Sequence, residues 1–113
     1  MMKIYHNSRC SKSRQTLELI QQAGETVEVI DYIKTPPTAT EVKELLQKLN
    51  MKPQELLRKG EAVYKENYKG KELSDEEWVD AMVQHPILIE RPIVVKDNKA
   101  VIGRPPENVK DLL

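Results

Sequence analysis

Hydrophobic and polar residues alternate in three different ways along the first part of the chain. Residues 3–5 form a short apolar run that predicts a strand, and residues 11–23 place Leu and Ile at helical spacing. Gly24 suits the position just after a last helical turn. Residues 27–31 are rich in β-branched side chains and predict a second strand. A strand–helix–strand unit of this length implies two parallel strands with a right-handed crossover.

The middle of the chain has a helical pattern throughout. Two hydroxyl residues stand three positions before a Glu, the spacing of a capping box: Thr38–Glu41 and Ser74–Glu77. The first box opens a helix over 41–49, and the second opens a helix that His85-Pro86 ends. Pro53 begins a short helix predicted to run through Arg58, and residues 61–70 form another. Three side chains of that last helix are expected to point inward: Val63, Tyr64 and Tyr68.

The last part of the chain returns to strands. Residues 92–96 and 100–102 predict a hairpin around a turn at Asp97-Asn98, and a terminal helix is expected over 107–113. The element order is that of an α/β protein with a thioredoxin-like fold, in which a four-stranded mixed sheet carries a helical insertion between its second and third strands. We expect residues 1–113 to form a single domain, with the insertion at about 38–88.

Composition narrows the functional classes. The chain has 18 basic and 18 acidic residues, so bulk positive charge does not favour nucleic-acid binding. Its one cysteine excludes an internal disulfide, and the two histidines lack the paired spacing of a metal site. No apolar run approaches the ~20 residues that span a bilayer. We therefore expect a cytoplasmic monomer without metal, bound cofactor or membrane contact, in a reducing compartment that suits a reactive thiol.

The turn between the first strand and the first helix carries the candidate chemistry. Cys10 lies there, and free N–H groups at a helix N-terminus favour a thiolate. Arg9, Lys12 and Arg14 add positive charge where a helix disfavours it, which points to a functional anion. Ser13 stands three residues after the cysteine, where its hydroxyl and its N–H can reach the sulfur. The alternative is a buried, inert cysteine beside a solvated basic face.

Topology brings two arginines towards this turn. If the third strand is antiparallel to the first, Arg91 precedes it and Arg104 follows the fourth strand at the same end of the sheet as Cys10. Guanidinium groups suit tetrahedral oxyanions. Arg58 could reach the same site, but topology does not require it. Each arginine also has an alternative, purely structural role: Arg58 as a cation at a helix C-terminus, Arg91 as an exposed residue held extended by the following proline, and Arg104 in an ion pair with Glu107.

The pattern alone leaves two further features near the turn open: the role of His6 and the isomer of the Arg91-Pro92 bond. His6 ends the first strand, where it either tunes the thiolate or is an ordinary half-buried polar residue. The Arg91-Pro92 bond is an X–Pro bond, for which the cis form costs little, although trans is the ordinary expectation.

These features together resemble the glutaredoxin-linked arsenate reductase family. The resemblance covers essentially the whole chain and rests on Tyr5-His6-Asn7-x-x-Cys10-x-x-Ser13-Arg14, Thr35-Pro36-Pro37, Leu56-Leu57-Arg58-Lys59, Gln84-His85-Pro86-Ile87-Leu88-Ile89, Arg91-Pro92-Ile93-Val94-Val95 and Gly103-Arg104-Pro105. It implies a catalytic cysteine at Cys10, a histidine near the thiolate at His6, a cis bond before Pro92, and three substrate-binding arginines: Arg58, Arg91 and Arg104.

The resemblance also implies an activity. In it, the thiolate attacks arsenate or a similar oxyanion, glutathione attacks the arsenic adduct, and glutaredoxin clears the resulting mixed disulfide. The lack of a second cysteine agrees with an external thiol as the reductant. Ser8 and Ser11 stand where the reductases usually have Pro and Gly, and both border Cys10.

Two other functions remain open from the sequence. Spx-type regulators, which bind RNA polymerase, share the fold but commonly carry a Cys-x-x-Cys switch, and Ser13 replaces its second cysteine here. The third possibility is a glutathione-dependent oxidoreductase that acts on an organic disulfide.

Overall fold

The computed structural model describes residues 2–113 and divides the chain into two compact units. The first unit holds residues 2–35 and 91–113, and the second holds Pro36–Glu90. Each unit is described by itself. Residues 38–88, where the helical insertion was expected, lie within the second unit, and both the placement of the insertion and the expectation of one domain stay predictions.

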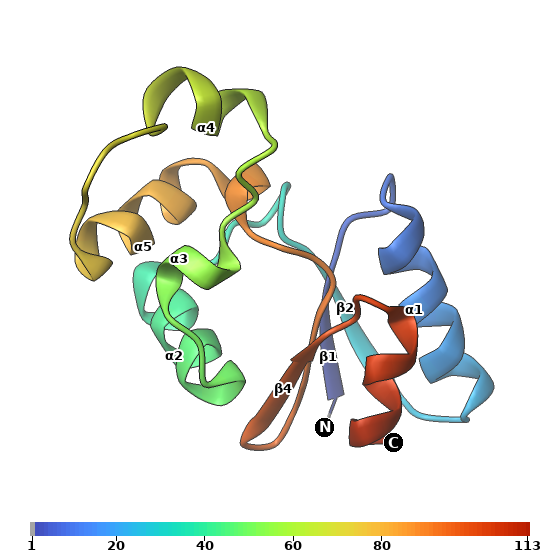
Figure 1. The fold of residues 1–113 in the computed structure, drawn as a ribbon. Coiled ribbons are helices and arrows are strands. Elements are labelled where there is room, and N and C mark those ends of the chain that lie inside the picture. The colour runs from blue at the N-terminus through green and yellow to red at the C-terminus, as the bar shows by residue number, and fades with distance from the viewer. Residues whose placement is uncertain (1) are drawn as a thin grey trace. The chain divides into compact units, whose positions relative to one another are not determined.

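The first unit is built on a four-stranded sheet (Figure 1). Its strands are β1 (Met2–His6), β2 (Val27–Asp31), β3 (Ile93–Lys96) and β4 (Lys99–Ile102), in the spatial order β2-β1-β3-β4. β1 and β2 are parallel, whereas β3 runs antiparallel to both β1 and β4. The mixed sheet, its parallel β-α-β unit and the hairpin are therefore confirmed, and with them the thioredoxin-like fold.

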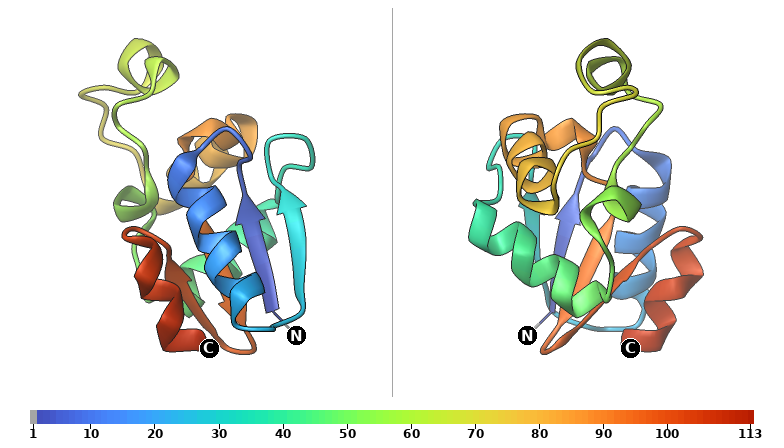
Figure 2. Two further views of the ribbon diagram at one scale, coloured as in Figure 1. Left: turned by 90° about the vertical axis from the view of Figure 1, so that its right-hand side faces the viewer. Right: turned by 60° about the vertical axis from the view of Figure 1, so that its left-hand side comes forward.

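Two helices cover one face of this sheet. Helix α1 (Ser11–Gln22) and the 3₁₀ helix η2 (Pro106–Leu112) lie side by side there (Figure 2). Apolar side chains from the helices and from the sheet form one buried cluster: Met2, Ile4, Ile20, Val94, Val109 and Leu112. The terminal helix was predicted in the right place, but it is a 3₁₀ helix. The helix spans seven residues, and its buried side chains, Pro106, Val109 and Leu112, recur every third position, the spacing that a 3₁₀ helix with three residues per turn places on one face.

The second unit is helical. It contains α2 (Ala39–Leu49), α3 (Pro53–Leu56), α4 (Ala62–Asn67), α5 (Asp75–Gln84) and the 3₁₀ helix η1 (Pro86–Leu88). Both predicted capping boxes are present: the hydroxyls of Thr38 and Ser74 each accept an N–H three residues on, and the glutamates reciprocate. The buried faces of α2 and α5 pack against each other, and α5 also contacts α3 and η1.

Two helices of this unit are shorter than predicted. Helix α3 ends at Leu56 because Leu57 pairs with Ile89 in an isolated antiparallel bridge. Long-range backbone pairing thus overrides the local helical pattern around Arg58, whose N–H donates to the Leu88 carbonyl. Helix α4 covers six residues and has no fully buried side chain.

The inward-pointing residues predicted for α4 are only half-buried. The rings of Tyr64 and Tyr68 lie 6.3 and 5.9 Å from the ring of the buried Trp78. Aromatic contact with α5, and not full burial, is therefore what orients this segment.

Candidate active site

Cys10 is the N-cap residue of α1, as its place in the sequence suggested. Its backbone is extended (φ −96°, ψ 121°), and its N–H donates to the Asn7 carbonyl at 3.0 Å. The Asn7 side chain in turn accepts the N–H of Arg9 at 3.0 Å. The first turn of α1 contains no acidic residue, so the positive end of the helix faces the sulfur without competition.

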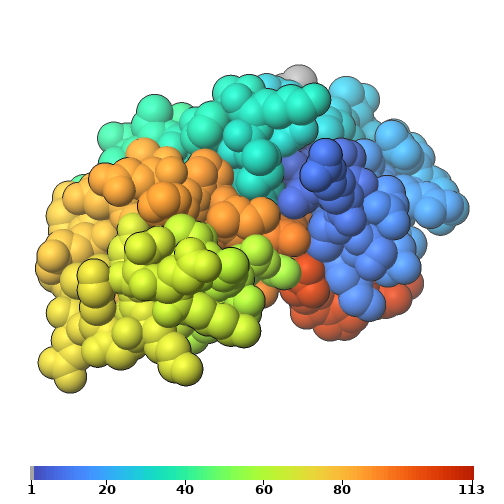
Figure 3. Space-filling model, turned by 90° about the horizontal axis from the view of Figure 1, so that it is seen from above, coloured from blue at the N-terminus to red at the C-terminus, as the bar shows by residue number. Residues whose placement is uncertain are grey.

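Both arginines predicted from topology act on this sulfur. Arg104 donates from Nη2 to Cys10 Sγ at 3.3 Å and from Nε to the Arg91 carbonyl at 2.7 Å. The Arg91 side chain also hydrogen-bonds the sulfur. In the space-filling view the dark-blue segment that carries the turn borders the red segment that follows β4 (Figure 3).

The surroundings of Cys10 favour its anion. Burial raises the pKa of the Cys10 thiol, but the Ser13 N–H, the Arg91 side chain and the charge of Arg104 outweigh burial. The net pKa lies below the ordinary value of a cysteine. The named neighbours of the buried sulfur are hydrogen-bond donors and cations, and the reactivity of Cys10 stays a prediction.

Ser13 links the sulfur to His6. Its hydroxyl lies 2.6 Å from His6 Nδ1 and accepts the Asn7 N–H at 3.0 Å, so it is engaged away from the sulfur and only its N–H serves the thiolate. A hydroxyl has one proton and two lone pairs, so the Ser13 oxygen can accept the Asn7 N–H and still donate its proton to Nδ1 of a neutral His6 ring. Burial lowers the pKa of His6, which Asp31 raises in part and Arg14 lowers again, so the neutral ring is favoured.

Arg14 and Pro92 hold the backbone around the site. Arg14 is exposed, and its Nη1 donates to the Ser8 carbonyl at 2.9 Å. The bond between Arg91 and Pro92 is cis, the form that the resemblance implies, and the bond between Arg104 and Pro105 is cis as well, which was not predicted. Ser8 and Ser11, the two departures from the reductase pattern, are both exposed.

Arg58 belongs to the second unit and has different partners. Its guanidinium forms ion pairs with Glu61 and Glu90, in place of the helix-end role considered from the sequence. Burial lowers the pKa of Arg58, but Glu90 and Glu61 raise it to a net value above the ordinary one. Its predicted part in substrate binding stays a prediction.

Asn7 is the site residue that sequence reasoning missed. It is nearly buried and supplies three contacts to the turn, through its N–H, its carbonyl and its side-chain oxygen. In an Asx turn, the side-chain oxygen of an Asn accepts the N–H of the residue two positions later, as Asn7 does with Arg9. The segment Asn7-Ser8-Arg9 could therefore have been predicted to form such a turn.

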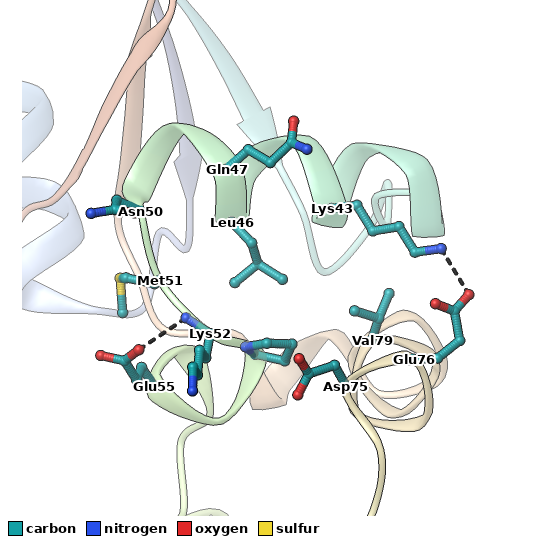
Figure 4. A pocket seen from close by; sticks show the side chains of 11 residues that line it. Lys43, Leu46, Gln47, Asn50, Met51, Lys52, Glu55, Asp75, Glu76 and Val79 are labelled. Atoms are coloured by element: carbon teal, nitrogen blue, oxygen red, sulfur yellow. Dashed lines mark hydrogen bonds and ion pairs between the residues drawn. The ribbon is translucent and has the colours of Figure 1, made fainter.

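The second unit also contains a groove of its own, between α2, α3 and the start of α5 (Figure 4). It encloses ≈ 610 Å³, has Leu46 and Val79 among its lining residues, and is flanked by the Lys43–Glu76 ion pair at 2.7 Å. Its lining residues include no cysteine, serine or threonine, so the groove offers no thiol or hydroxyl nucleophile.

Within residues 2–113, no group of three or more His, Cys, Asp or Glu side chains is arranged to hold a metal ion. The same part of the chain has no helix both long and apolar enough to cross a membrane.

Known proteins resemble this chain over almost its full length. The ArsC family matches residues 5–112. The arsenate reductase of Neisseria meningitidis serogroup A is 40% identical over 114 residues, which cover 99% of this chain and 97% of that protein. The uncharacterized protein YfgD of Escherichia coli K12 is 49% identical over 99% of this chain and 96% of its own. The solved structure of the arsenate reductase from Vibrio cholerae superimposes with a TM-score of 0.95 at 46% identity, covering 99% of this chain and 97% of that one.

Proposed function

Because the chain belongs to the ArsC family, we propose that it is a thiol-dependent oxidoreductase that reduces arsenate to arsenite, with Cys10 as the nucleophile. The observation that carries this proposal is the contact between Arg104 Nη2 and Cys10 Sγ at 3.3 Å. An arginine that stabilises a thiolate can also hold the oxyanion that the thiolate attacks.

The first step is a substitution at arsenic. The Cys10 sulfur forms a bond to arsenic(V), and one oxygen of arsenate leaves as water after protonation. Arg91 and Arg104 balance the remaining negative charge, and the free N–H groups at the start of α1 add to that field. Arg58 is the third arginine that the resemblance assigns to the oxyanion.

The second step uses an external thiol. Glutathione attacks the adduct, two sulfur atoms together give up two electrons, and arsenic(V) becomes arsenic(III) while a disulfide forms between Cys10 and glutathione. Arsenate and two thiols thus yield arsenite, a disulfide and water. Glutaredoxin then takes the glutathione sulfur and restores the Cys10 thiol. Since the electrons come from thiols, no bound cofactor is needed, and a reducing cytoplasm keeps both thiols available.

A coupled assay tests the activity. Arsenate is added to the protein with glutathione, glutaredoxin, glutathione reductase and NADPH, and NADPH consumption is followed. We expect arsenate-dependent turnover that falls at least 10³-fold, about the effect of losing an essential nucleophile, in Cys10→Ser. The matched control is Ser11→Ala, which changes an exposed neighbour in the same turn and should retain turnover.

Two results would contradict the proposal. One is NADPH consumption that does not depend on arsenate but does depend on an added organic disulfide, which indicates a general glutathione-dependent oxidoreductase. The other is no turnover with any of these substrates, together with specific retention of RNA polymerase on the immobilised protein, which indicates an Spx-like regulator.

A further inference from the structure

Gly103 lies where three parts of the first unit meet. It follows β4 directly and precedes Arg104, the residue whose guanidinium contacts Cys10. Its N–H donates to the Pro92 carbonyl at 2.9 Å, and the hydroxyl of Thr16, on α1, shares its one proton between the Gly103 carbonyl at 3.4 Å and the Lys12 carbonyl at 2.8 Å. One residue without a side chain therefore joins the helix that carries Cys10 to the two loops that carry the arginines.

The contact is too close for any other residue. A Cβ on Gly103 would lie 2.8 Å from Pro92 Cγ, 3.0 Å from Thr16 Cγ2 and closer still to Thr16 Oγ1. Distances under 3.0 Å force something to move, and here the neighbours are a proline ring and a fully buried threonine. The backbone φ of Gly103 is not in the left-handed region, so space, and not chain conformation, is what requires glycine.

Thr16 is held as firmly as the glycine. Its side chain is 0% exposed, and its hydroxyl donates to the Lys12 carbonyl one turn earlier in α1 at 2.8 Å. That bond fixes the rotamer that faces Gly103. Movement at this contact would shift Arg104 relative to the start of α1, where the sulfur lies.

We infer that Gly103 and Thr16 are positioning residues, which set how closely the Arg104 guanidinium approaches the Cys10 sulfur. This inference rests on the proposed use of Cys10 as a nucleophile. It concerns the acidity of the thiol, however, and that can be measured without arsenate.

The test is the pH profile of Cys10 alkylation by iodoacetamide in the full chain. Gly103→Ala pushes the loop away from α1, so we expect the pKa of the thiol to rise and the rate at pH 7 to fall about tenfold, the change that one pKa unit brings. Gly60→Ala is the matched control, since a Cβ there meets nothing within 4 Å and the rate should stay the same. Circular dichroism and the melting temperature establish that each variant is folded.

Two double variants separate positioning from general loosening of the fold. In an Arg104→Ala background, Gly103→Ala should produce no further change in the profile, because the group it positions is gone. Thr16→Ala removes Oγ1 and Cγ2, two of the three atoms that a Cβ on Gly103 would meet, so in that background Gly103→Ala should raise the thiol pKa clearly less than it does alone.

Three results would overturn the inference. They are an unchanged thiol pKa in folded Gly103→Ala, an equal shift in the Arg104→Ala background, and strict additivity with Thr16→Ala.

Should Gly103→Ala not fold, Thr16→Val replaces it. This variant keeps the size of the side chain and removes the hydroxyl that binds the Lys12 and Gly103 carbonyls, so we expect a slowing of about twofold, absent when Arg104 is Ala. A normal profile in folded Thr16→Val would equally reject the inference. A failed arsenate assay with the expected alkylation results would reject the proposed function alone.

Discussion

Arg104 in the first unit and Arg58 in the second are both half-buried arginines that the sequence marks as candidates for the same anion, yet their partners differ in charge. Arg104 donates to a neutral carbonyl, that of Arg91, and to the sulfur of Cys10. Arg58 forms ion pairs with two carboxylates, those of Glu61 and Glu90. The carbonyl of Arg91 orients Arg104 towards the sulfur, whereas the carboxylates of Glu61 and Glu90 hold the guanidinium of Arg58.

The difference shows two ways in which a guanidinium is held in place, by a neutral carbonyl in Arg104 and by carboxylates in Arg58. A hydrogen bond to a backbone carbonyl restricts the side chain without cancelling its field. An ion pair restricts it equally well but leaves less net charge for a ligand. Arg104 already contacts the sulfur in this arrangement, whereas the Arg58 guanidinium contacts carboxylates.

The largest effect on the reactivity of Cys10 should come from Arg104→Ala, with Arg58→Ala as the comparison. Arg104→Ala removes the cation beside the sulfur, so the thiol pKa should rise and alkylation at pH 7 should slow about tenfold. Arg58→Ala removes a charge that two carboxylates already balance, and should change the rate by less than about twofold. The measurement is the pH-dependent rate with iodoacetamide. Equal effects of the two variants would abolish the distinction.

A smaller effect should appear in stability as a function of pH. The pKa of Cys10 is lowered in the folded protein, so the thiolate stabilises the fold fully above the unfolded-state pKa of about 8.5, and this contribution is lost as the pH falls through the folded-state pKa. Wild type should therefore gain stability over Cys10→Ser as the pH rises towards 8.5. Urea unfolding of both proteins across that range measures the gain, and a difference that is independent of pH would show that the fold does not favour the thiolate.

The smallest effect on the sulfur should come from the caps of the second unit. Thr38→Ala or Ser74→Ala removes one side of a capping box and should lower the free energy of unfolding by about 1 kcal/mol. Neither change touches a group that lowers the pKa of Cys10, so alkylation should keep its rate. Thr38→Ser keeps the hydroxyl and should be nearly neutral in urea unfolding. A slower alkylation in the Ala variants would indicate that the second unit does act on the thiol.

Much of the site around Cys10 was predictable because it depends on strand order and chain direction. A β-α-β start followed by a hairpin places Cys10, Arg91 and Arg104 at one end of the sheet, and the structure joins all three. Ser13 was predicted near the sulfur, and its backbone N–H serves the thiol, but its hydroxyl is engaged by the Asn7 N–H and the His6 ring.

The environment of Arg58 was not predictable, because it depends on a pairing distant in sequence. The local pattern continues a helix through Leu57, and only the bridge between Leu57 and Ile89 brings Glu90 to the guanidinium. The close contact of Gly103 with Thr16 is of the same kind, since no pattern in either segment announces the other.

The sequence by itself determined the strands, the two capping boxes, the position of Cys10 at a helix start and the direction of the chain on either side of it. These are local properties, decided by side-chain periodicity, hydroxyl caps and glycine or proline at the ends of elements. Only the tertiary structure decided which cation acts on the sulfur, which is balanced by carboxylates, and which glycine sets the distance. Those outcomes follow from contacts between residues far apart along the chain, where a shift of less than an ångström separates a hydrogen bond from a clash.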